Sequence, residues 1–294
     1  MLLLADAPPG APSAAEVMAR AGGENFPVAS RVLPRRSRAH LLALYGFARL
    51  VDELGDGGGG SPADRLAALG WLQEELERAY DGRARHPLLI RLQATLRACA
   101  LPREPFLRLI EANRVDQRVA RYETWEQLLG YCELSANPVG ELVLGVFGKA
   151  TPERVALSDR ICTALQLAEH WQDIAEDFAR GRIYLPREDR ARFGCEEGEL
   201  AADDERRGAQ ASWRLRGLLA FEVARTRALL AQGLELIALL RGRERVAVAA
   251  FAGGARAALD AVERAGYDVL AAPPQASRTR RLGATAALLA GRRR

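Results

Sequence analysis

The chain has 294 residues, of which 49% are hydrophobic and 27% are charged, and its 42 basic and 38 acidic side chains leave a net charge of +4. This length suits one large or two small globular domains, and the small net charge without an aromatic-rich basic patch argues against a nucleic-acid partner. No apolar run approaches the roughly 18 residues of a membrane span, and the start MLLLADAPPG lacks the basic region of a signal peptide.

Apolar residues recur with a helical period along the first third of the chain. From about Arg36 to Leu54 they form one continuous stripe, and residues 57–60, all glycine, then mark a loop. Ser61 and Pro62 are typical of a helix start, with a side-chain cap followed by a proline in the first turn.

The same period continues through the rest of the chain. Thr124 has the setting of a helix cap, the proline after Asn137 interrupts a helix, and Thr151 opens a long one. Residues 210–240 predict the longest helix, and residues 245–265 predict another. Strand-like alternation is nearly absent and no fixed repeat is visible, so we expect an all-α single domain.

Two acidic clusters lie far apart in the sequence, one in ALYGFARLVDELGD and the other in EHWQDIAEDFARGRIYLP. Asp52 and Asp56, like Asp173 and Asp177, are four residues apart, so on a helix each pair shares one face with side chains roughly 6 Å apart. Such like charges repel unless a cation lies between them. A single pair of this kind is most often a solvated helix face, but both clusters continue apolar helices, which favours the border of a cavity.

Two facing acidic helices suit Mg²⁺, which binds a few carboxylates and keeps positions open for water and substrate phosphates. The four scattered cysteines form no CxxC pair, and with the three histidines they make no zinc pattern. We therefore expect reduced thiols in a cytoplasmic protein and no transition-metal site.

The end of the chain is basic. After Asp268 it contains six arginines and no acidic residue. We expect a frayed, solvated terminus, and the alternative is a segment that rests on an anionic membrane surface. The sequence thus divides into an N-terminal extension (1–23), a helical domain (24–270) and a basic C-terminal tail (271–294).

Four segments resemble the squalene/phytoene synthases, the head-to-head prenyl-condensing enzymes. They are ENFPVASRVLPRRSRAHLLALYGFARLVDELGD, RYETWEQLLGYCELSANPVGELVL, ALQLAEHWQDIAEDFARGRIYLP and, more weakly, ALDAVERAGYDVL. Within this family the chain is most similar to the hydroxysqualene synthase branch of bacterial hopanoid pathways. The resemblance implies an isoprenoid synthase fold, with helices around a central apolar cavity, two facing acidic motifs and a prenyl diphosphate substrate.

The resemblance also implies roles for individual residues. The four aspartates of the two clusters match those that hold Mg²⁺ for the diphosphate, and Glu53 replaces the middle aspartate of the first motif. Tyr131 matches a catalytic tyrosine that points into the cavity, and Tyr184 fits a structural role as well as a functional one. The matches to substrate-binding positions are Phe26, Tyr45, Arg49, Gly140, Gln166, Glu169, Gln172 and Arg182.

By the same resemblance, the chain is expected to be a lyase that converts presqualene diphosphate and water into hydroxysqualene and diphosphate. Glu24 stands where the family is basic, and Glu169 and Gln172 replace asparagine and arginine, so the diphosphate site is less basic than in enzymes that condense two substrates. Glu169, His170 or Tyr131 could hold the attacking water. No GxGxxG follows a strand, so no nicotinamide is expected.

Two other functions stay open. One is a prenyltransferase, namely a presqualene diphosphate, squalene or phytoene synthase that condenses two prenyl diphosphates. The other is a non-catalytic scaffold of the pathway. In each case the other squalene-pathway enzymes are candidate partners.

Overall fold

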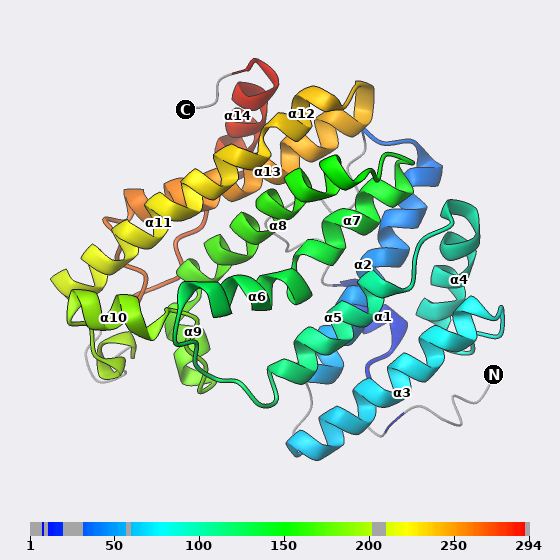
Figure 1. Cartoon of the computed structure of the whole chain (residues 1–294), viewed down its shortest axis with the longest axis horizontal. Coiled ribbons are helices and arrows are strands. Elements are labelled where there is room, and N and C mark those ends of the chain that lie inside the picture. The colour runs from blue at the N-terminus through cyan, green and yellow to red at the C-terminus, as the bar shows by residue number, and fades with distance from the viewer. Residues whose placement is uncertain (1–7, 9–10, 20–31, 57–59, 202–209, 292–294) are drawn as a thin grey trace.

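A computed structural model of the chain describes residues 8, 11–19, 32–56, 60–201 and 210–291. These residues fold mainly into α-helices (Figure 1), and the one extended pairing found among them is an isolated bridge between Arg121 and Ile183. The expected all-α fold is confirmed. The elements are α1 (Ala14–Ala19), α2 (Arg35–Asp56), α3 (Pro62–Tyr80), α4 (Pro87–Cys99), α5 (Glu104–Val115), α6 (Trp125–Ser135), α7 (Asn137–Val146), α8 (Pro152–Gln172), α9 (Ile174–Ala179), α10 (Arg187–Phe193), the 3₁₀ turn η2 (Glu197–Leu200), α11 (Trp213–Gly233), α12 (Glu235–Leu239), α13 (Gly242–Arg264) and α14 (Arg278–Leu289).

Side-chain caps begin several helices at the predicted positions. Ser61 accepts a hydrogen bond from the Asp64 backbone N–H at the start of α3, and the Asp64 carboxylate accepts one from the Ser61 N–H in return. Thr124 and Thr151 each accept from the N–H three residues on, at the starts of α6 and α8. The expected interruption at Asn137 is also present, because α6 ends at Ser135 and α7 begins at Asn137.

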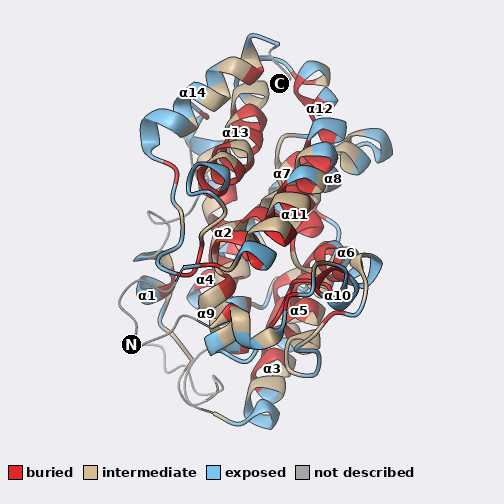
Figure 2. Ribbon diagram, turned by 90° about the vertical axis from the view of Figure 1, so that its left-hand side faces the viewer, coloured by how far each residue is buried: buried red, intermediate tan, exposed pale blue. Residues whose placement is uncertain are grey.

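Two apolar cores hold the helices. The first is built mainly from α2 to α5, where Phe47 and Phe106 meet edge to face with ring centroids 5.1 Å apart. The second is built around α8, α11 and α13, and Figure 2 shows buried residues concentrated there. In it the buried Trp171 indole N–H donates to Thr226 Oγ1 at 2.9 Å.

Residues 210–240 do not form the longest helix, so this prediction was wrong. The helix α11 ends at Gly233 and α12 begins at Glu235, so the predicted helix is interrupted. α13 with 23 residues is longer than α11 with 21. At Gly233 a Cβ would come within 2.7 Å of both the Leu157 carbonyl and the Ile161 side chain of α8. The close approach therefore requires glycine, and glycine is a poor residue for continuing a helix.

The second acidic cluster lies at a helix break rather than inside one continuous helix. α8 ends at Gln172 and α9 begins at Ile174, while Asp173 between them has φ −103° and ψ 18°. The Asp177 N–H still donates to the Asp173 carbonyl at 2.8 Å, so the four-residue spacing of one helical turn is kept.

The C-terminal tail is not frayed throughout, which corrects the prediction from its composition. Residues 278–289 form α14, which begins with a cap from the Ser277 hydroxyl and lies along α13 (Figure 1). Thr285 packs against Gly253 of α13, and Leu288 is buried. Small residues on α13 allow the two helices to approach, which composition alone did not reveal.

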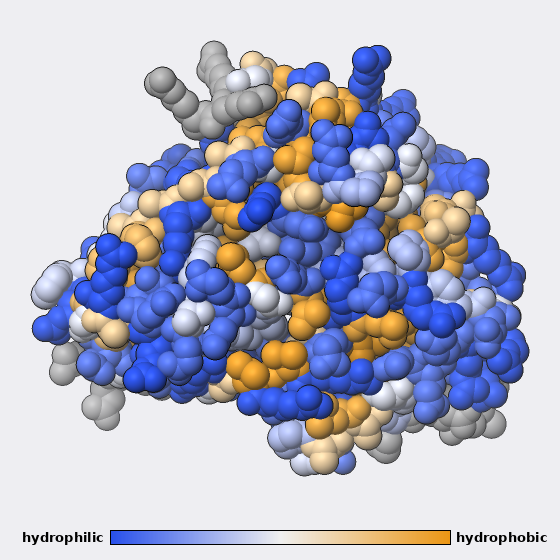
Figure 3. All heavy atoms as spheres, viewed as in Figure 1, coloured by the Kyte–Doolittle hydropathy of each residue, from blue (hydrophilic) through white to orange (hydrophobic). Residues whose placement is uncertain are grey.

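The surface is mostly hydrophilic on the face shown in Figure 3, with apolar side chains in separate groups. Among the helices of the described ranges, none combines the length and the apolar character that crossing a membrane requires.

The contact between α13 and α14 gives the first prediction. A Cβ at Gly253 would lie 2.9 Å from the Thr285 backbone nitrogen, whereas a Cβ at Gly283 on α14 meets nothing within 4 Å. We expect Gly253→Ala to destabilise the protein by about 1–3 kcal/mol, because overpacking outweighs the gain of up to about 1 kcal/mol in helix propensity.

The matched control, Gly283→Ala, makes the same chemical change without a clash and is expected to be neutral or stabilising. Urea unfolding of both variants provides the measurement. A Gly253→Ala protein as stable as Gly283→Ala would contradict the described packing of α14.

Candidate active site

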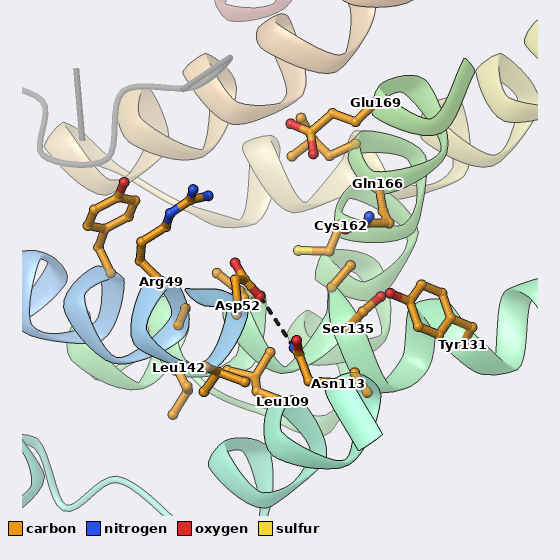
Figure 4. A pocket seen from close by; sticks show the side chains of 18 of the residues that line it. Arg49, Asp52, Leu109, Asn113, Tyr131, Ser135, Leu142, Cys162, Gln166 and Glu169 are labelled. Atoms are coloured by element: carbon orange, nitrogen blue, oxygen red, sulfur yellow. Dashed lines mark hydrogen bonds between the residues drawn. The ribbon is translucent and has the colours of Figure 1, made fainter. Parts of the chain in front are cut away.

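A cavity of about 400 Å³ lies between helices of both cores. Its walls come mainly from α2, α5, α6, α7, α8 and α13, together with the segment that follows α9. Much of the wall is apolar, with Leu44, Leu142, Leu144 and Ile161 among the contributing side chains. Figure 4 shows part of this wall, with polar side chains directed into the cavity from α2 on one side and α8 on the other.

Both predicted acidic pairs line this one cavity. Asp52 and Asp56 come from the end of α2, Asp173 from the break between α8 and α9, and Asp177 from α9. Among the described residues, six acidic side chains and three arginines line the cavity, which leaves an excess of three negative charges. A wall of this charge favours cations.

The acidic side chains have shifted pKa values. Burial raises the pKa of Asp52 to about 7, and the charge of Asp56 adds to the rise. A hydrogen bond from Asn113 Nδ2 to Asp52 Oδ1, 3.3 Å long and visible in Figure 4, acts in the opposite direction. The Asp52 side chain stays open to water within the cavity, which moderates the effect of burial. Burial raises the pKa of Asp173 to about 6, with a further rise from Asp177.

The donor set fits Mg²⁺ that is shared with a bound ligand. Within the part of the chain that the structure describes, no three histidine, cysteine, aspartate or glutamate side chains gather closely enough to hold a metal by themselves. Carboxylate oxygens are ligands that Mg²⁺ prefers, and it commonly takes one or two of them together with water and phosphate oxygens. Two aspartates on each side of the cavity match this pattern.

Two predicted substrate-binding arginines line the cavity and are paired with the first acidic cluster. Arg49 Nη2 lies 2.9 Å from Glu53 Oε1, and Arg182 Nη2 lies 2.7 Å from Asp56 Oδ1. Glu53 is not among the residues that line the cavity. The structure therefore gives Glu53 an ion pair with Arg49, and its role as a metal ligand stays a prediction.

Most other predicted residues also lie in the cavity wall. Tyr45, Gln166 and Glu169 line it, and so does Gly140 at the contact between α7 and α8. A Cβ at Gly140 would lie 2.6 Å from Cys162 Sγ and closer still to the Ser158 hydroxyl, so the wall requires glycine there.

Two predicted substrate-binding residues are not found in the wall. Gln172 is buried, and its side-chain amide donates to the carbonyl of Pro274 in the segment between α13 and α14. This bond holds the end of α8 to the C-terminal segment instead of a ligand. Phe26 lies outside the described residues.

Sequence reasoning missed the centre of a polar and aromatic cluster on the cavity wall. Tyr131 donates to Asp116 Oδ2 at 2.8 Å, and Tyr184 donates to Asp116 Oδ1 at 3.4 Å. The His170 ring stacks on Tyr184 with centroids 3.7 Å apart, and its Nδ1 lies 3.6 Å from Asp177 Oδ2. Burial raises the pKa of Asp116.

A weak signal for this cluster was present in the sequence. Asn113 lies on α5, and Asp116 is the residue that follows the end of this helix. The two are three residues apart and share one face, where the other buried residues of α5 are apolar. Neither belongs to an acidic pair, and only the fold brings them beside Tyr131 and Asp52.

Comparison with known proteins gives a consistent result. A family model described as Squalene/phytoene synthase matches residues 19–282. The chain is 37% identical over 180 residues to a hydroxysqualene synthase of Sinorhizobium fredii, an alignment that covers 61% of this chain and 60% of the relative. It is 31% identical over 238 residues to a phytoene synthase of Mycobacterium tuberculosis, which covers 81% of this chain and 77% of that relative. The alignment with the first of these relatives thus spans about three fifths of its length.

Solved structures agree with the fold. The squalene synthase HpnC from Alicyclobacillus acidocaldarius is similar with a TM-score of 0.76 and 46% identity, over 85% of this chain and 92% of that one. A dehydrosqualene synthase crystallised with a ligand has a TM-score of 0.82 at 24% identity, over 95% of both chains, which supports the fold alone.

The raised pKa of Asp52 predicts a pH-dependent stability. A carboxyl group with a raised pKa in the folded chain stabilises it fully below the ordinary value of 3.8, and that stability is lost as the pH rises through about 7. Asp52→Asn removes the charge, so we expect it to raise the thermal midpoint of the protein in EDTA more at about pH 8 than at about pH 5.

Asp64→Asn serves as the control with the opposite sign. Hydrogen bonds from Ser61 lower the pKa of Asp64, so its carboxylate stabilises the fold at higher pH and its loss costs more there. Thermal unfolding across the pH range tests both variants, and an Asp52→Asn gain that does not grow with pH would contradict the effect of burial.

Proposed function

The chain belongs to the squalene/phytoene synthase family, and we propose that it is a hydroxysqualene synthase of squalene and hopanoid biosynthesis. It would convert presqualene diphosphate and water into hydroxysqualene and diphosphate. One observation carries the proposal: a largely apolar cavity is bordered by the Asp52/Asp56 pair and the Asp173/Asp177 pair. Such a cavity suits a long hydrocarbon with a diphosphate head. The similarity to hydroxysqualene synthases and to HpnC supports this choice within the family.

The four aspartates would hold the diphosphate end of the substrate. Magnesium bound to them would supply Lewis-acid stabilisation of the negative charge on the leaving group. Arg49 and Arg182 line the same cavity, and each is paired with a carboxylate of the first acidic cluster. A diphosphate brings stronger and bidentate acceptors for a guanidinium, so both arginines can exchange their partners for it.

The rest of the cavity would shelter the cation that remains after ionisation. Leu44, Leu144 and Val139 exclude bulk water from the hydrocarbon. The ring of Tyr131 lines the cavity, and an aromatic ring favours a nearby positive charge. The apolar side chains and the aromatic ring together would stabilise the cation until one water attacks it.

Between Tyr131 and His170 as candidates for holding that water, the contacts favour Tyr131. Its hydroxyl hydrogen is engaged with Asp116, which leaves a lone pair to accept a hydrogen from water. His170 is stacked on Tyr184 and its Nε2 lies 3.1 Å from the Gln166 amide nitrogen, so both its face and its edge are occupied.

The condensation of two prenyl diphosphates is the second candidate function. It is supported by the phytoene synthase alignment, which spans more of the chain than the hydroxysqualene synthase alignments do. Two diphosphates would bring twice the negative charge to a cavity where acidic side chains already outnumber arginines by six to three. This charge balance supports the single-diphosphate reaction.

The proposed substrate carries a long hydrocarbon chain and the proposed product is an alcohol of very low solubility in water, so we place the proposed reaction on the cytoplasmic side of a membrane, near the other squalene-pathway enzymes. Peripheral contact is supported by α14, where Arg278 and Arg280 are exposed and Leu282 is 70% exposed. A basic helix with an exposed apolar residue suits an anionic lipid surface.

The proposed function is tested by incubating the purified protein with Mg²⁺ and presqualene diphosphate, without nicotinamide, and identifying products by mass spectrometry. A parallel sample receives farnesyl diphosphate alone. We expect hydroxysqualene in the first sample and no condensation product in the second. Presqualene diphosphate in the second sample would favour the condensing reaction, and no product in either would favour a scaffold.

The role of Asp173 gives a further prediction. We expect Asp173→Asn to lower turnover by at least roughly a hundredfold, since metal-assisted charge stabilisation contributes several kcal/mol to the barrier. The variant should also lose the thermal stabilisation that Mg²⁺ with inorganic diphosphate gives the parent protein, about 2.7 kcal/mol when ligand is at 100 times its dissociation constant.

Glu176→Gln is the matched control, because Glu176 lies on α9 between the same two aspartates but is exposed and paired with Arg180. It should keep both turnover and stabilisation. Near-normal turnover in Asp173→Asn would contradict the assignment of this aspartate to the metal.

A further inference from the structure

Ser135 differs from the other polar side chains of the cavity wall. It is the last residue of α6 and lines the cavity, yet its buried Oγ has no hydrogen-bond partner among the residues that the structure describes. Other polar groups of the wall are engaged, Asn113 with Asp52 and Tyr131 with Asp116. A buried hydroxyl without a partner costs about 1–3 kcal/mol, and a helical serine can normally bond to the carbonyl one turn back.

The position of Ser135 relative to Tyr131 is set by the helix. The two residues are four apart on α6, so their side chains share one face and are stacked along it. Figure 4 shows the hydroxyl groups of both directed to the same part of the wall. The Ser135 oxygen is carried on a single rotatable bond, so rotation about χ1 is the one side-chain movement that redirects it.

The two hydroxyls have complementary hydrogen-bonding capacity. Tyr131 gives its hydrogen to Asp116 over 2.8 Å and keeps a lone pair, while Ser135 has a hydrogen to give. A water molecule that donates to Tyr131 and accepts from Ser135 is held at two points, with one lone pair left. Farther along the chain, Ala136, Val139 and Gly140 also line the cavity, and their side chains carry no donor.

We propose that the Ser135 hydroxyl, together with Tyr131, holds the water that traps the carbocation and so decides the product. This role rests on the proposed function. The diphosphate leaves with the electron pair of its C–O bond, and a lone pair of the held water forms the new C–O bond. One proton passes from this water to Tyr131 as Tyr131 gives its own proton to the Asp116 carboxylate, which later releases it to solvent. Ser135 neither gains nor loses a proton.

The surroundings of the relay agree with this order of events. Burial raises the pKa of Tyr131 well above its ordinary range, so this hydroxyl stays protonated and passes a proton on only as it receives one. Burial also raises the pKa of Asp116, which makes its carboxylate a better proton acceptor.

The test measures how the cation is partitioned between products. Parent protein, Ser135→Ala, Ser135→Thr and Ser158→Ala are each incubated with Mg²⁺ and presqualene diphosphate in water enriched in ¹⁸O, and both diphosphate release and labelled hydroxysqualene are quantified. Ser158→Ala is the control. Ser158 lines the same cavity, but its hydroxyl has a hydrogen-bond partner, Cys162 Sγ, at 3.9 Å.

We expect Ser135→Ala to release diphosphate nearly as fast as the parent, while the share of hydroxysqualene among its products falls roughly three- to tenfold, the factor that one lost hydrogen bond represents. Hydrocarbons formed by proton loss should rise in its place. Ser135→Thr keeps the hydroxyl and should restore the share, and Ser158→Ala should leave it unchanged. Thermal midpoints of all four proteins confirm that they are folded.

The outcomes separate the two proposals. Absence of hydroxysqualene from the parent would overturn the proposed function and the role of Ser135 with it. A parent that forms hydroxysqualene while Ser135→Ala forms the same share would overturn the role of Ser135 alone. The role of Ser135 would also be overturned if folded Ser135→Ala protein stopped releasing diphosphate. An equal shift of products in Ser158→Ala would overturn it too, because neither result is specific to a water held by Ser135.

Discussion

Repulsion among carboxylates is the constraint around which this molecule is arranged. Six acidic side chains face one cavity, and burial together with mutual repulsion raises the pKa of Asp52 and of Asp173. Helices that carry such charges would separate if nothing else held them. The first acidic pair lies at the end of α2, which is anchored in a core through Phe47 and Leu50. The second pair begins directly after α8, which is anchored through Trp171.

The arginines of the cavity relieve part of this repulsion from within the chain. Arg49 and Arg182 pair with Glu53 and Asp56 in the structure, so the first acidic cluster is partly neutralised. In the second cluster Arg180 pairs with Glu176, which leaves Asp173 and Asp177 without an arginine partner of this kind among the ion pairs of the described residues. Under the proposed function, arginines held in this way would exchange their carboxylate partners for a diphosphate, because an exchange of acceptors costs less than leaving a charge unpaired. The remaining excess of acidic side chains over arginines in the cavity wall favours the binding of cations.

The four aspartates of the two acidic pairs line one cavity, and their role as metal ligands stays a prediction. Sequence reasoning placed these residues correctly, because their local spacing and the resemblance to the family locate them. It failed where a position depends on contacts distant in sequence. Gln172 bonds to Pro274, about a hundred residues on, and no local pattern announces that partner. Asp116 is bonded to Tyr131 and Tyr184, which only the fold brings to it.

The choice of product in such a cavity depends on very few atoms. Ionisation needs charge at one end, and any family member with two acidic pairs can provide it, whereas the fate of the cation depends on what lines the remaining wall. In an apolar wall a cation loses a proton or is attacked by another carbon, because water is excluded. A single hydroxyl in that wall changes the balance by the value of one hydrogen bond, about 1 kcal/mol, which corresponds to a several-fold change in partition. A buried hydroxyl without a partner lowers the stability of the fold by a similar or larger amount. Under the proposal, the Ser135 hydroxyl therefore destabilises the empty protein and in return positions the attacking water.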